Sequence, residues 1–327
     1  MTEANVTRDV LAQFAINATA IQPLGNAGGF SGACIFKVVT AEQTYCLKKW
    51  PDSTDIDNLH WIHRVLVFAA ANGCPELTTP RKNLRGKTIL LDSHGIWELT
   101  NWAAGSANYA KQPTFEKLNS AIQFLARFHQ ATARFHFNFT PSRNIKVALE
   151  RLQAFDSIVA AVAKAQTTED LITKQQLDDF SQNGRALAIA LAQKLVPLQS
   201  QPLPVQPVIR DFRAEHLFFE GDDLVSVIDF GAMRIDSVAC DLSRIIGDTI
   251  GDDESESDQV LQQYNAIRPL QPTEWQLSKL LNQSSVIVGI LNWLDWLIIQ
   301  RRDFDESESV RARLKTLFRR FQSWNEL

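Results

Sequence analysis

The chain of 327 residues has few cysteines, and those it has form no recognisable framework. Cys34, Cys46, Cys74 and Cys240 are widely scattered, and no two of them make a Cys-x-x-Cys pair. This spacing argues against a zinc site and against a disulfide framework. Free thiols in a reducing compartment fit the pattern better, so we expect a cytoplasmic protein.

The sequence also lacks a strong charge and a long apolar run. A formal net charge of −4 gives no electrostatic footprint for nucleic acid. The most apolar late stretch, residues 286–299, contains Asn292 and Asp295 and is too short to span a bilayer. Residues 1–17 show no basic segment followed by an apolar one, so no signal peptide is expected. We therefore expect neither a nucleic-acid partner nor a membrane.

Hydrophobic residues make up 45% of the sequence, which is enough to build one large or two medium domains. Apolar periodicity predicts a series of helices. They are expected at residues 7–18, 57–72, 115–136, 145–165, 171–195, 275–281, 285–300 and 310–324. Strands are expected at residues 34–39, 44–50, 88–91 and 96–100, and residues 199–207 are expected to be an extended connection. The N-terminal third is thus rich in strands and the remainder is mainly helical.

The stretch from Val208 to Gly231 carries the strongest chemical pattern. Two apolar runs each lead to an aspartate, Asp211 and Asp229, which lie 18 positions apart. Between them, Leu217-Phe218-Phe219 and a Gly-Asp-Asp turn predict a hairpin. Such a hairpin holds a loop aspartate and a strand-end aspartate near one pocket. Two carboxylates placed in this way are suited to orient a hydroxyl and to bind a metal–phosphate group.

A cluster of glycines precedes the first predicted strand. Glycine lets backbone N–H groups approach phosphate oxygens closely, so Gly28, Gly29 and Gly32 are candidate nucleotide-binding residues. An ordinary glycine-rich turn has the same composition. The phosphate interpretation is favoured by Lys48, in the next strand, where kinases place the lysine that pairs with nucleotide phosphates. Strand alternation points Lys49 to the opposite face.

This ordered set resembles the aminoglycoside phosphotransferase and choline/homoserine kinase-like group of small-molecule kinases. That group has His-Gly-Asp, four residues, Asn, a short hairpin and Ile-Asp-Phe-Gly. The corresponding residues here are Ile209-Arg210-Asp211, then His216, then Ile228-Asp229-Phe230-Gly231. Both aspartates match, whereas the His-Gly pair and the Asn are replaced.

The resemblance implies an α+β, protein-kinase-like fold with two lobes. A small β-rich N-lobe is expected at residues 1–100 and a larger, mainly helical C-lobe at residues 101–327. Residues 98–102 lie where the hinge of such a kinase reads the adenine edge through its backbone. Glu98 and Thr100 are therefore candidate nucleotide-binding residues.

The resemblance also implies the chemistry: transfer of the γ-phosphoryl group of ATP or GTP to a hydroxyl of a small molecule. Asp211 accepts or orients the hydroxyl proton. Asp229 binds Mg²⁺ or Mn²⁺, with His216 at the position of the metal-binding Asn. Lys48 neutralises the phosphates, and Asp241, in the Asp-Leu-Ser that opens a later helix, braces the catalytic loop.

Two departures from the family pattern leave alternatives open. No glutamate occurs between residues 43 and 75, so the partner of Lys48 is left unassigned. His60 and His63, within the helix at 57–72, are expected on a packed or partly exposed surface rather than as a metal pair. Because an imidazole is a poor Mg²⁺ ligand, the site binds one metal through Asp229 alone, uses Mn²⁺ instead, or is inactive. The alternative function is a catalytically silent, kinase-like protein that binds a nucleotide or another ligand.

The acceptor itself is not named by the sequence. An acidic stretch at residues 248–258 is either a solvated loop or a rim that attracts a cationic acceptor. Trp293 and Trp296, three positions apart on an apolar helix, are expected in the core rather than in a cation-binding cage. We expect a small-molecule hydroxyl acceptor, and no feature indicates the oligomeric state.

Overall fold

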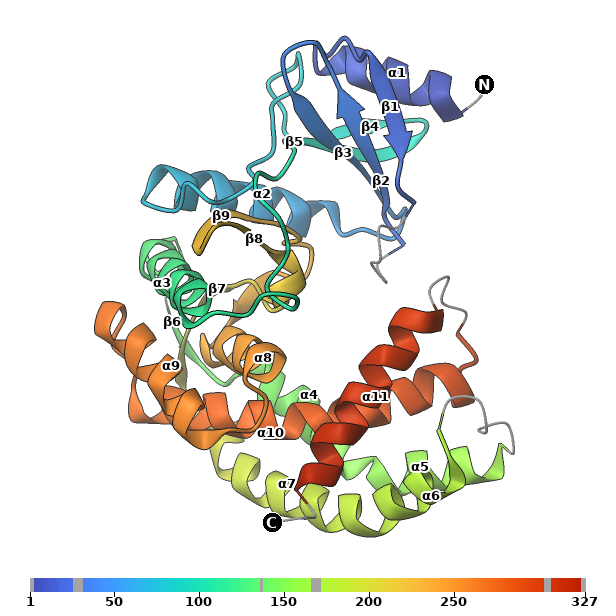
Figure 1. Cartoon of the computed structure of the whole chain (residues 1–327), viewed down its shortest axis with the longest axis vertical. Coiled ribbons are helices and arrows are strands. Elements are labelled where there is room, and N and C mark those ends of the chain that lie inside the picture. The colour runs from blue at the N-terminus through green and yellow to red at the C-terminus, as the bar shows by residue number, and fades with distance from the viewer. Residues whose placement is uncertain (1–2, 26–31, 136–137, 166–171, 303–306, 325–327) are drawn as a thin grey trace. The chain divides into compact units, whose positions relative to one another are not determined.

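The computed structural model describes residues 3–25, 32–135, 138–165, 172–302 and 307–324 (Figure 1). The chain forms two compact units, the first containing residues 1–135 and 214–233, the second residues 136–213 and 234–327. The expected lobe boundary at residue 100 falls close to the end of the N-terminal sheet. The first unit extends beyond it, because it also includes the next helix and the hairpin at residues 217–227.

The first unit is built on a five-stranded antiparallel sheet with strand order β1-β2-β3-β5-β4. The strands are β1 (Ala20–Pro23), β2 (Cys34–Val39), β3 (Thr44–Trp50), β4 (Leu90–Asp92) and β5 (Gly95–Asn101). The predictions of β2 and β3 are confirmed residue for residue, and the predicted hairpin that contains β5 is confirmed with small shifts. β1, a short edge strand, was not predicted.

Two helices cover the sheet, α1 (Glu3–Gln13) on one face and α2 (Ile56–Ala71) on the other. On the α1 face, the fully buried Leu47 and Leu99 share a core with Leu11 of α1. On the α2 face, Trp50 and Ile96 pack with Leu59. Because successive side chains of a strand point to opposite faces, Lys48 and Glu98 lie on the face that α2 covers.

The first unit also contains α3 (Phe115–Thr132) and the hairpin of β8 (Leu217–Glu220) and β9 (Asp223–Val227). The chain that leaves the sheet crosses this hairpin, because Ser106 and Phe219 form a bridge. Gly105 has φ +77°, and a Cβ there would meet the Phe219 carbonyl oxygen at 2.7 Å. Only glycine allows this close approach in the left-handed conformation.

The second unit combines helices with a three-stranded sheet of order β10-β7-β6. The strands are β6 (Asn138–Thr140), β7 (Leu203–Val208) and β10 (Arg234–Asp236). The helices are α4 (Arg143–Gln153), α5 (Phe155–Lys164), α6 (Lys174–Asp179), α7 (Arg185–Gln199), α8 (Ala239–Thr249), α9 (Glu254–Ile267), α10 (Pro272–Leu294) and α11 (Ser307–Ser323). None of the helices in the described residues is long and apolar enough to cross a membrane.

Element boundaries differ from the predictions where helices adjoin. The helix expected at 145–165 is divided at Ala154 into α4 and α5. The helix expected at 171–195 contains a π-helical turn at Phe180–Gly184, and α10 joins two helices that were expected separately. The extended connection before Val208 contains β7. Periodicity finds the apolar faces here, but it does not locate a one-residue break between two helices.

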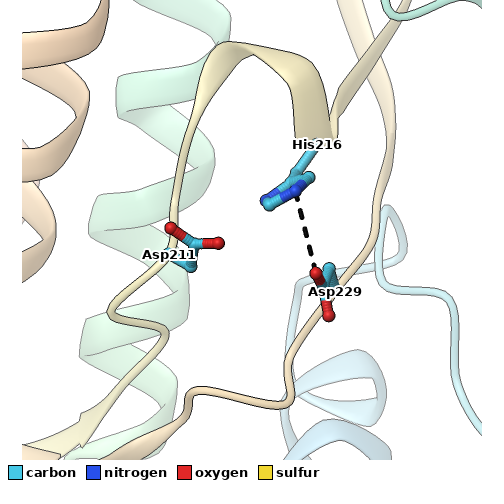
Figure 2. Close-up of side chains that lie close together, drawn as sticks. All are labelled: Asp211, His216 and Asp229. Atoms are coloured by element: carbon cyan, nitrogen blue, oxygen red, sulfur yellow. Dashed lines mark ion pairs between the residues drawn. The ribbon is translucent and has the colours of Figure 1, made fainter. Parts of the chain in front are cut away.

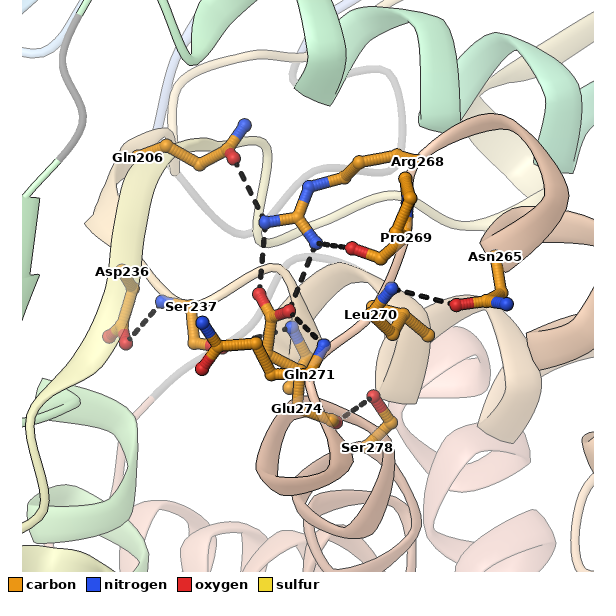
Figure 3. A network of polar contacts seen from close by, with 11 residues as sticks. Gln206, Asp236, Ser237, Asn265, Arg268, Pro269, Leu270, Gln271, Glu274 and Ser278 are labelled. Carbon is orange, nitrogen blue, oxygen red and sulfur yellow. Dashed lines mark hydrogen bonds and ion pairs between the residues drawn. The ribbon is translucent and has the colours of Figure 1, made fainter.

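A buried ion pair holds β7 in place within the second unit. Arg268, 9% exposed, donates to both carboxylate oxygens of Glu274, which is 1% exposed, at 2.9 and 3.1 Å. The same guanidinium donates to the side-chain oxygen of Gln206 on β7 at 3.2 Å. Figure 3 shows the guanidinium between these two partners. Satisfied in this way, the two charges tie the strand that leads to Asp211 to the start of α10.

Candidate active site

Lys48, on β3, connects the sheet with the Asp-Phe-Gly segment. Its ammonium lies 3.5 Å from Oδ1 of Asp229, a residue 181 positions later in the sequence. It also lies 3.9 Å from the centre of the Trp50 ring, and the Lys48 side chain is 13% exposed. Lys49, in contrast, lies over Trp97 on the other face of the sheet. The prediction that Lys48 and Lys49 lie on opposite faces of the sheet is therefore confirmed.

Asp229 follows β9 with φ +62°, a left-handed conformation that aspartate tolerates better than most residues. Its side chain is 40% exposed. Burial alone raises the pKa of this carboxyl, but the charges of Lys48 and His216 outweigh burial, and the pKa lies below its usual value. Asp229 is thus ionised at neutral pH and half-open to solvent, as a metal-binding carboxylate must be.

Gly231, two residues on, packs against the ring that supports Lys48. A Cβ at Gly231 would lie 3.0 Å from the Trp50 ring. Trp50 therefore contacts both the lysine and the glycine of the Asp-Phe-Gly segment. Sequence reasoning missed this residue, although its position two after Lys48 in a strand places both side chains on one face.

His216 ends a short 3₁₀ turn, Ala214–His216. Its Nε2 lies 3.8 Å from Oδ2 of Asp229 and 3.8 Å from Oε1 of Glu215, and its side chain is 13% exposed. Figure 2 shows the imidazole directed toward the Asp229 carboxylate. The two oxygens of Asp229 thus face different neighbours, Lys48 on one side and His216 on the other.

Glu98 lies directly opposite Lys48 in the β3–β5 ladder. Its Oε2 is 2.8 Å from Nε2 of His63, a buried residue of α2 whose Nδ1 contacts the Thr88 hydroxyl at 2.9 Å. Burial raises the pKa of Glu98, but the hydrogen bond with His63 and the charges of His63 and Lys48 outweigh burial and lower it. Glu98 therefore gives Lys48 a neighbouring carboxylate. It comes from the strand β5 rather than from α2, and His63 of α2 holds it.

The two candidate nucleotide-binding residues of the expected hinge, Glu98 and Thr100, both belong to β5. Glu98 lies in the middle of β5, and its side chain is committed to His63. Thr100 also lies within β5, where it pairs with Cys46. The chain leaves the sheet only after Asn101, and the Trp102 amide still donates to the Thr44 carbonyl at 3.1 Å.

The glycine loop connects β1 and β2. Its base is closed by two hydrogen bonds, from the Leu24 amide to the Ile35 carbonyl at 2.8 Å and from the Ile35 amide to the Gly25 carbonyl at 2.7 Å. Gly32 has φ +72°, which requires a residue without a side chain for low strain. The other two candidates, Gly28 and Gly29, lie outside the described residues.

Asp211 belongs to the second unit and follows β7. The preceding residue, Arg210, has φ +67°, although its side chain disfavours that conformation. Asp241, fully buried in the first turn of α8, holds this bend. Its Oδ2 accepts the Ile209 amide at 2.7 Å, and its Oδ1 accepts the Arg210 amide. Arg210 occupies the glycine position of the family's His-Gly-Asp, and its conformation explains why glycine suits that position.

The chain path places Asp211 just before the junction of the two units. It precedes His216 by five positions and lies two residues from Ala214, where the first unit resumes. Figure 2 also draws Asp211, on the loop that leads into the 3₁₀ turn. In the sequence, this short loop joins the second unit to the turn that contains His216.

The sequence and the fold were compared with known proteins. A family model for the phosphotransferase enzyme family matches residues 24–275, about three quarters of the chain. The chain belongs to this phosphotransferase family. The matched range begins at the glycine loop and includes Lys48, Asp211, Asp229 and Asp241. No curated protein sequence matches the chain.

Solved structures share the kinase-like α+β fold over nearly the whole chain. The spectinomycin phosphotransferase APH(9)-Ia, solved with ADP and spectinomycin, has a TM-score of 0.73 at 12% identity, covering 100% of this chain and 99% of its own. An aminoglycoside phosphotransferase from Alicyclobacillus acidocaldarius has a TM-score of 0.67 at 13% identity, covering 98% and 96%. The amicoumacin kinase hAmiN, solved with AMP-PNP and Ca²⁺, has a TM-score of 0.62 at 13% identity, covering 98% and 94%. This family member therefore has the fold expected from its sequence.

Proposed function

We propose that this family member transfers the γ-phosphoryl group of ATP or GTP to a hydroxyl of a small molecule. The observation that carries the proposal is the pairing of Lys48 with Asp229. Phosphoryl transfer needs a cation for the phosphates and a carboxylate for the metal ion, and this pair brings the two charges together. The similar solved structures bound to ADP and to AMP-PNP support a nucleotide as the donor.

In the proposed reaction, the acceptor hydroxyl oxygen forms a bond to the γ-phosphorus while the bond to the bridging oxygen breaks and ADP or GDP leaves. The hydroxyl proton passes to Asp211. The chain between Asp211 and His216 spans at most about 18 Å when extended. Lys48 and the glycine loop that includes Gly32 neutralise and hold the phosphates.

Asp229 is the residue we propose to bind the divalent cation. Its ionised, half-exposed carboxylate is a suitable hard ligand, and the neighbouring His216 nitrogen makes a mixed donor pair. Mn²⁺ accepts imidazole more readily than Mg²⁺ does, so this pair fits Mn²⁺ at least as well. When bound, the cation neutralises the charge that develops on the phosphate oxygens.

Glu98 and His63 are proposed positioning residues for Lys48. In this chain they supply the carboxylate that the helix sequence does not contain. Glu98 holds a negative charge opposite Lys48, and His63 fixes the carboxylate to α2. The adenine-reading hinge is then proposed for the segment after β5, residues 101–105, with Thr100 at its start.

The function can be tested by a thermal-shift titration with ATP and GTP, each with Mg²⁺ or Mn²⁺, followed by a nucleotide-consumption assay over a panel of hydroxyl compounds. Lys48→Met should abolish the nucleotide-dependent shift and turnover. Lys49→Met is the matched control, because it removes the same charge from the opposite face of the same strand. Nucleotide binding without turnover on any acceptor would favour the catalytically silent alternative. Equal effects of the two substitutions would contradict the role of Lys48.

A further inference from the structure

Three arginines of the second unit surround the proposed base. Arg210 precedes Asp211 in the chain, and Arg213 follows it by two residues. Arg244, on α8, donates from Nε to the Arg210 carbonyl at 3.4 Å. Arg244 is within electrostatic range of Arg210, Arg213, Asp211 and Asp248. Asp211 and Asp248 are the carboxylates that act on Arg244 in this group.

The side chains of Arg210 and Arg213 are each held by another side chain of the second unit. Arg210 donates from Nη2 to Oδ1 of Asn144 at 3.2 Å, which anchors the left-handed bend before Asp211. Arg213 pairs with Asp248 at 3.6 Å, and both side chains are largely covered. Arg244 is the exposed member of the group. It is therefore the arginine whose guanidinium is placed to meet a ligand.

The acidic stretch that suggested a cationic acceptor is engaged with the protein. Both oxygens of Asp252 accept hydrogen bonds from Arg320, at 2.9 and 2.6 Å. Asp258 pairs with Lys279 at 2.6 Å, and Asp253 caps α9. These carboxylates balance charges within the second unit, so they give no reason to expect a cationic acceptor.

We propose that the acceptor is an alcohol that carries a carboxylate or phosphate group, and that Arg244 binds that group. The inference rests on the proposed function, since it concerns the molecule whose hydroxyl Asp211 deprotonates. A guanidinium presents paired N–H donors that match a carboxylate or a phosphate. An ammonium group at the same place meets the like charge of Arg244. Arg244 therefore determines acceptor specificity rather than phosphate transfer.

A panel of hydroxyl acceptors that differ in charge tests the inference. The panel contains glycerate, tartrate and glycerol 3-phosphate as anions, glycerol as the neutral compound, and choline and spectinomycin as cations. We expect kcat/KM for the best anion to exceed that for the neutral and cationic compounds by about tenfold or more, the worth of one charged hydrogen bond. Comparison of glycerate with glycerol 3-phosphate distinguishes a carboxylate from a phosphate. Preferred turnover of a cationic or neutral acceptor would overturn the inference.

Substitutions of Arg244 connect this preference to one side chain. Arg244→Gln should raise KM for the anionic acceptor about 10- to 100-fold and leave KM for ATP unchanged. Arg244→Lys should recover part of the loss, because it restores the charge without the paired donors. Arg185→Gln is the control, since Arg185 is an exposed arginine of the same unit whose partner is Asp156 on α5. An unchanged acceptor KM in Arg244→Gln would contradict the assignment.

A binding measurement separates this inference from the proposed function. Isothermal titration of malonate and of inorganic phosphate into the ADP-saturated protein requires no turnover. Binding that Arg244→Gln weakens about tenfold supports the anion site, even where no nucleotide is consumed and the proposed function fails. Nucleotide turnover together with no binding of either anion leaves the proposed function standing and overturns the inference.

Discussion

Asp229 and Asp241 are twelve positions apart, yet their surroundings give them different tasks. Asp241 is fully buried, and both of its oxygens accept backbone N–H groups of the bend at Ile209 and Arg210. Asp229 is 40% exposed, and its oxygens face the side chains of Lys48 and His216. Backbone N–H groups hold both oxygens of Asp241, whereas charged side chains face both oxygens of Asp229. From this difference we propose that Asp241 maintains structure and that Asp229 takes part in the chemistry.

The comparison predicts that the two aspartates respond oppositely to the same substitution. The largest effect on activity is expected for Asp229→Asn, because it removes the charge that binds the cation while asparagine still tolerates the left-handed backbone. We expect kcat/KM for ATP to fall about 1,000-fold or more, equivalent to ~4 kcal/mol of transition-state stabilisation. Melting temperature should change little. Steady-state kinetics measures the loss of activity, and calorimetry measures the melting temperature. A strong loss of stability in Asp229→Asn would contradict the difference proposed between Asp229 and Asp241.

Asp241→Asn should instead act on folding. It replaces a charged acceptor with an amide whose NH₂ faces a backbone N–H, and it leaves that buried donor without a partner. We expect the free energy of unfolding to fall by about 2–4 kcal/mol. Urea denaturation measures the change. An Asp241→Asn protein with unaltered stability and reduced activity would assign Asp241 to the chemistry instead.

The parts of the site that the sequence predicts are encoded within short stretches of the chain. The parts that it does not predict depend on contacts between residues far apart in the sequence. Alternation along the chain predicts the strands β2 and β3 and the face of the sheet on which Lys48 lies. Short motifs predict the two apolar runs that lead to Asp211 and Asp229. The Glu98–His63 pair joins residues 35 positions apart, and the Asp252–Arg320 pair joins residues 68 apart. No periodicity encodes such pairings. His63 did carry a signal, because it lies four residues after Leu59 on the buried stripe of α2.

Glu98→Gln removes the negative charge opposite Lys48. We expect kcat/KM for ATP to fall about tenfold, or ~1.4 kcal/mol, because the lysine loses the neighbour that holds its position. The pKa of Glu98 is lowered in the folded protein, so its contribution to stability is complete above the unfolded pKa of about 4.3 and is lost as pH falls through the folded value.

Urea midpoints measured from pH 6 to pH 3 check the sign of this effect. The wild-type protein should lose more stability than Glu98→Gln over the acid part of that range. Identical acid profiles for the two proteins would show that Glu98 is not a stabilising carboxylate.

The smallest effect is expected at Arg210, in the bend that Asp241 holds. Arg210→Gly relieves the left-handed strain but increases the freedom of the unfolded chain, so the unfolding free energy should change by less than about 1 kcal/mol. Arg210→Val should cost about 2 kcal/mol or more, because a β-branched residue is strained at φ +67°. Denaturation of the two variants gives the comparison. A more stable valine variant would contradict the conformation described for this bend.

The measurement that tests the central claim most directly is detection of the phosphorylated acceptor by mass spectrometry with wild-type, Asp211→Ala and Asp222→Ala proteins. Asp222 is an exposed aspartate at the tip of the β8–β9 hairpin and serves as the control. The proposed mechanism predicts product from the wild-type and Asp222→Ala proteins and a loss of about 100-fold or more in Asp211→Ala, the usual worth of a positioned base. Product formed at the wild-type rate by Asp211→Ala would contradict it.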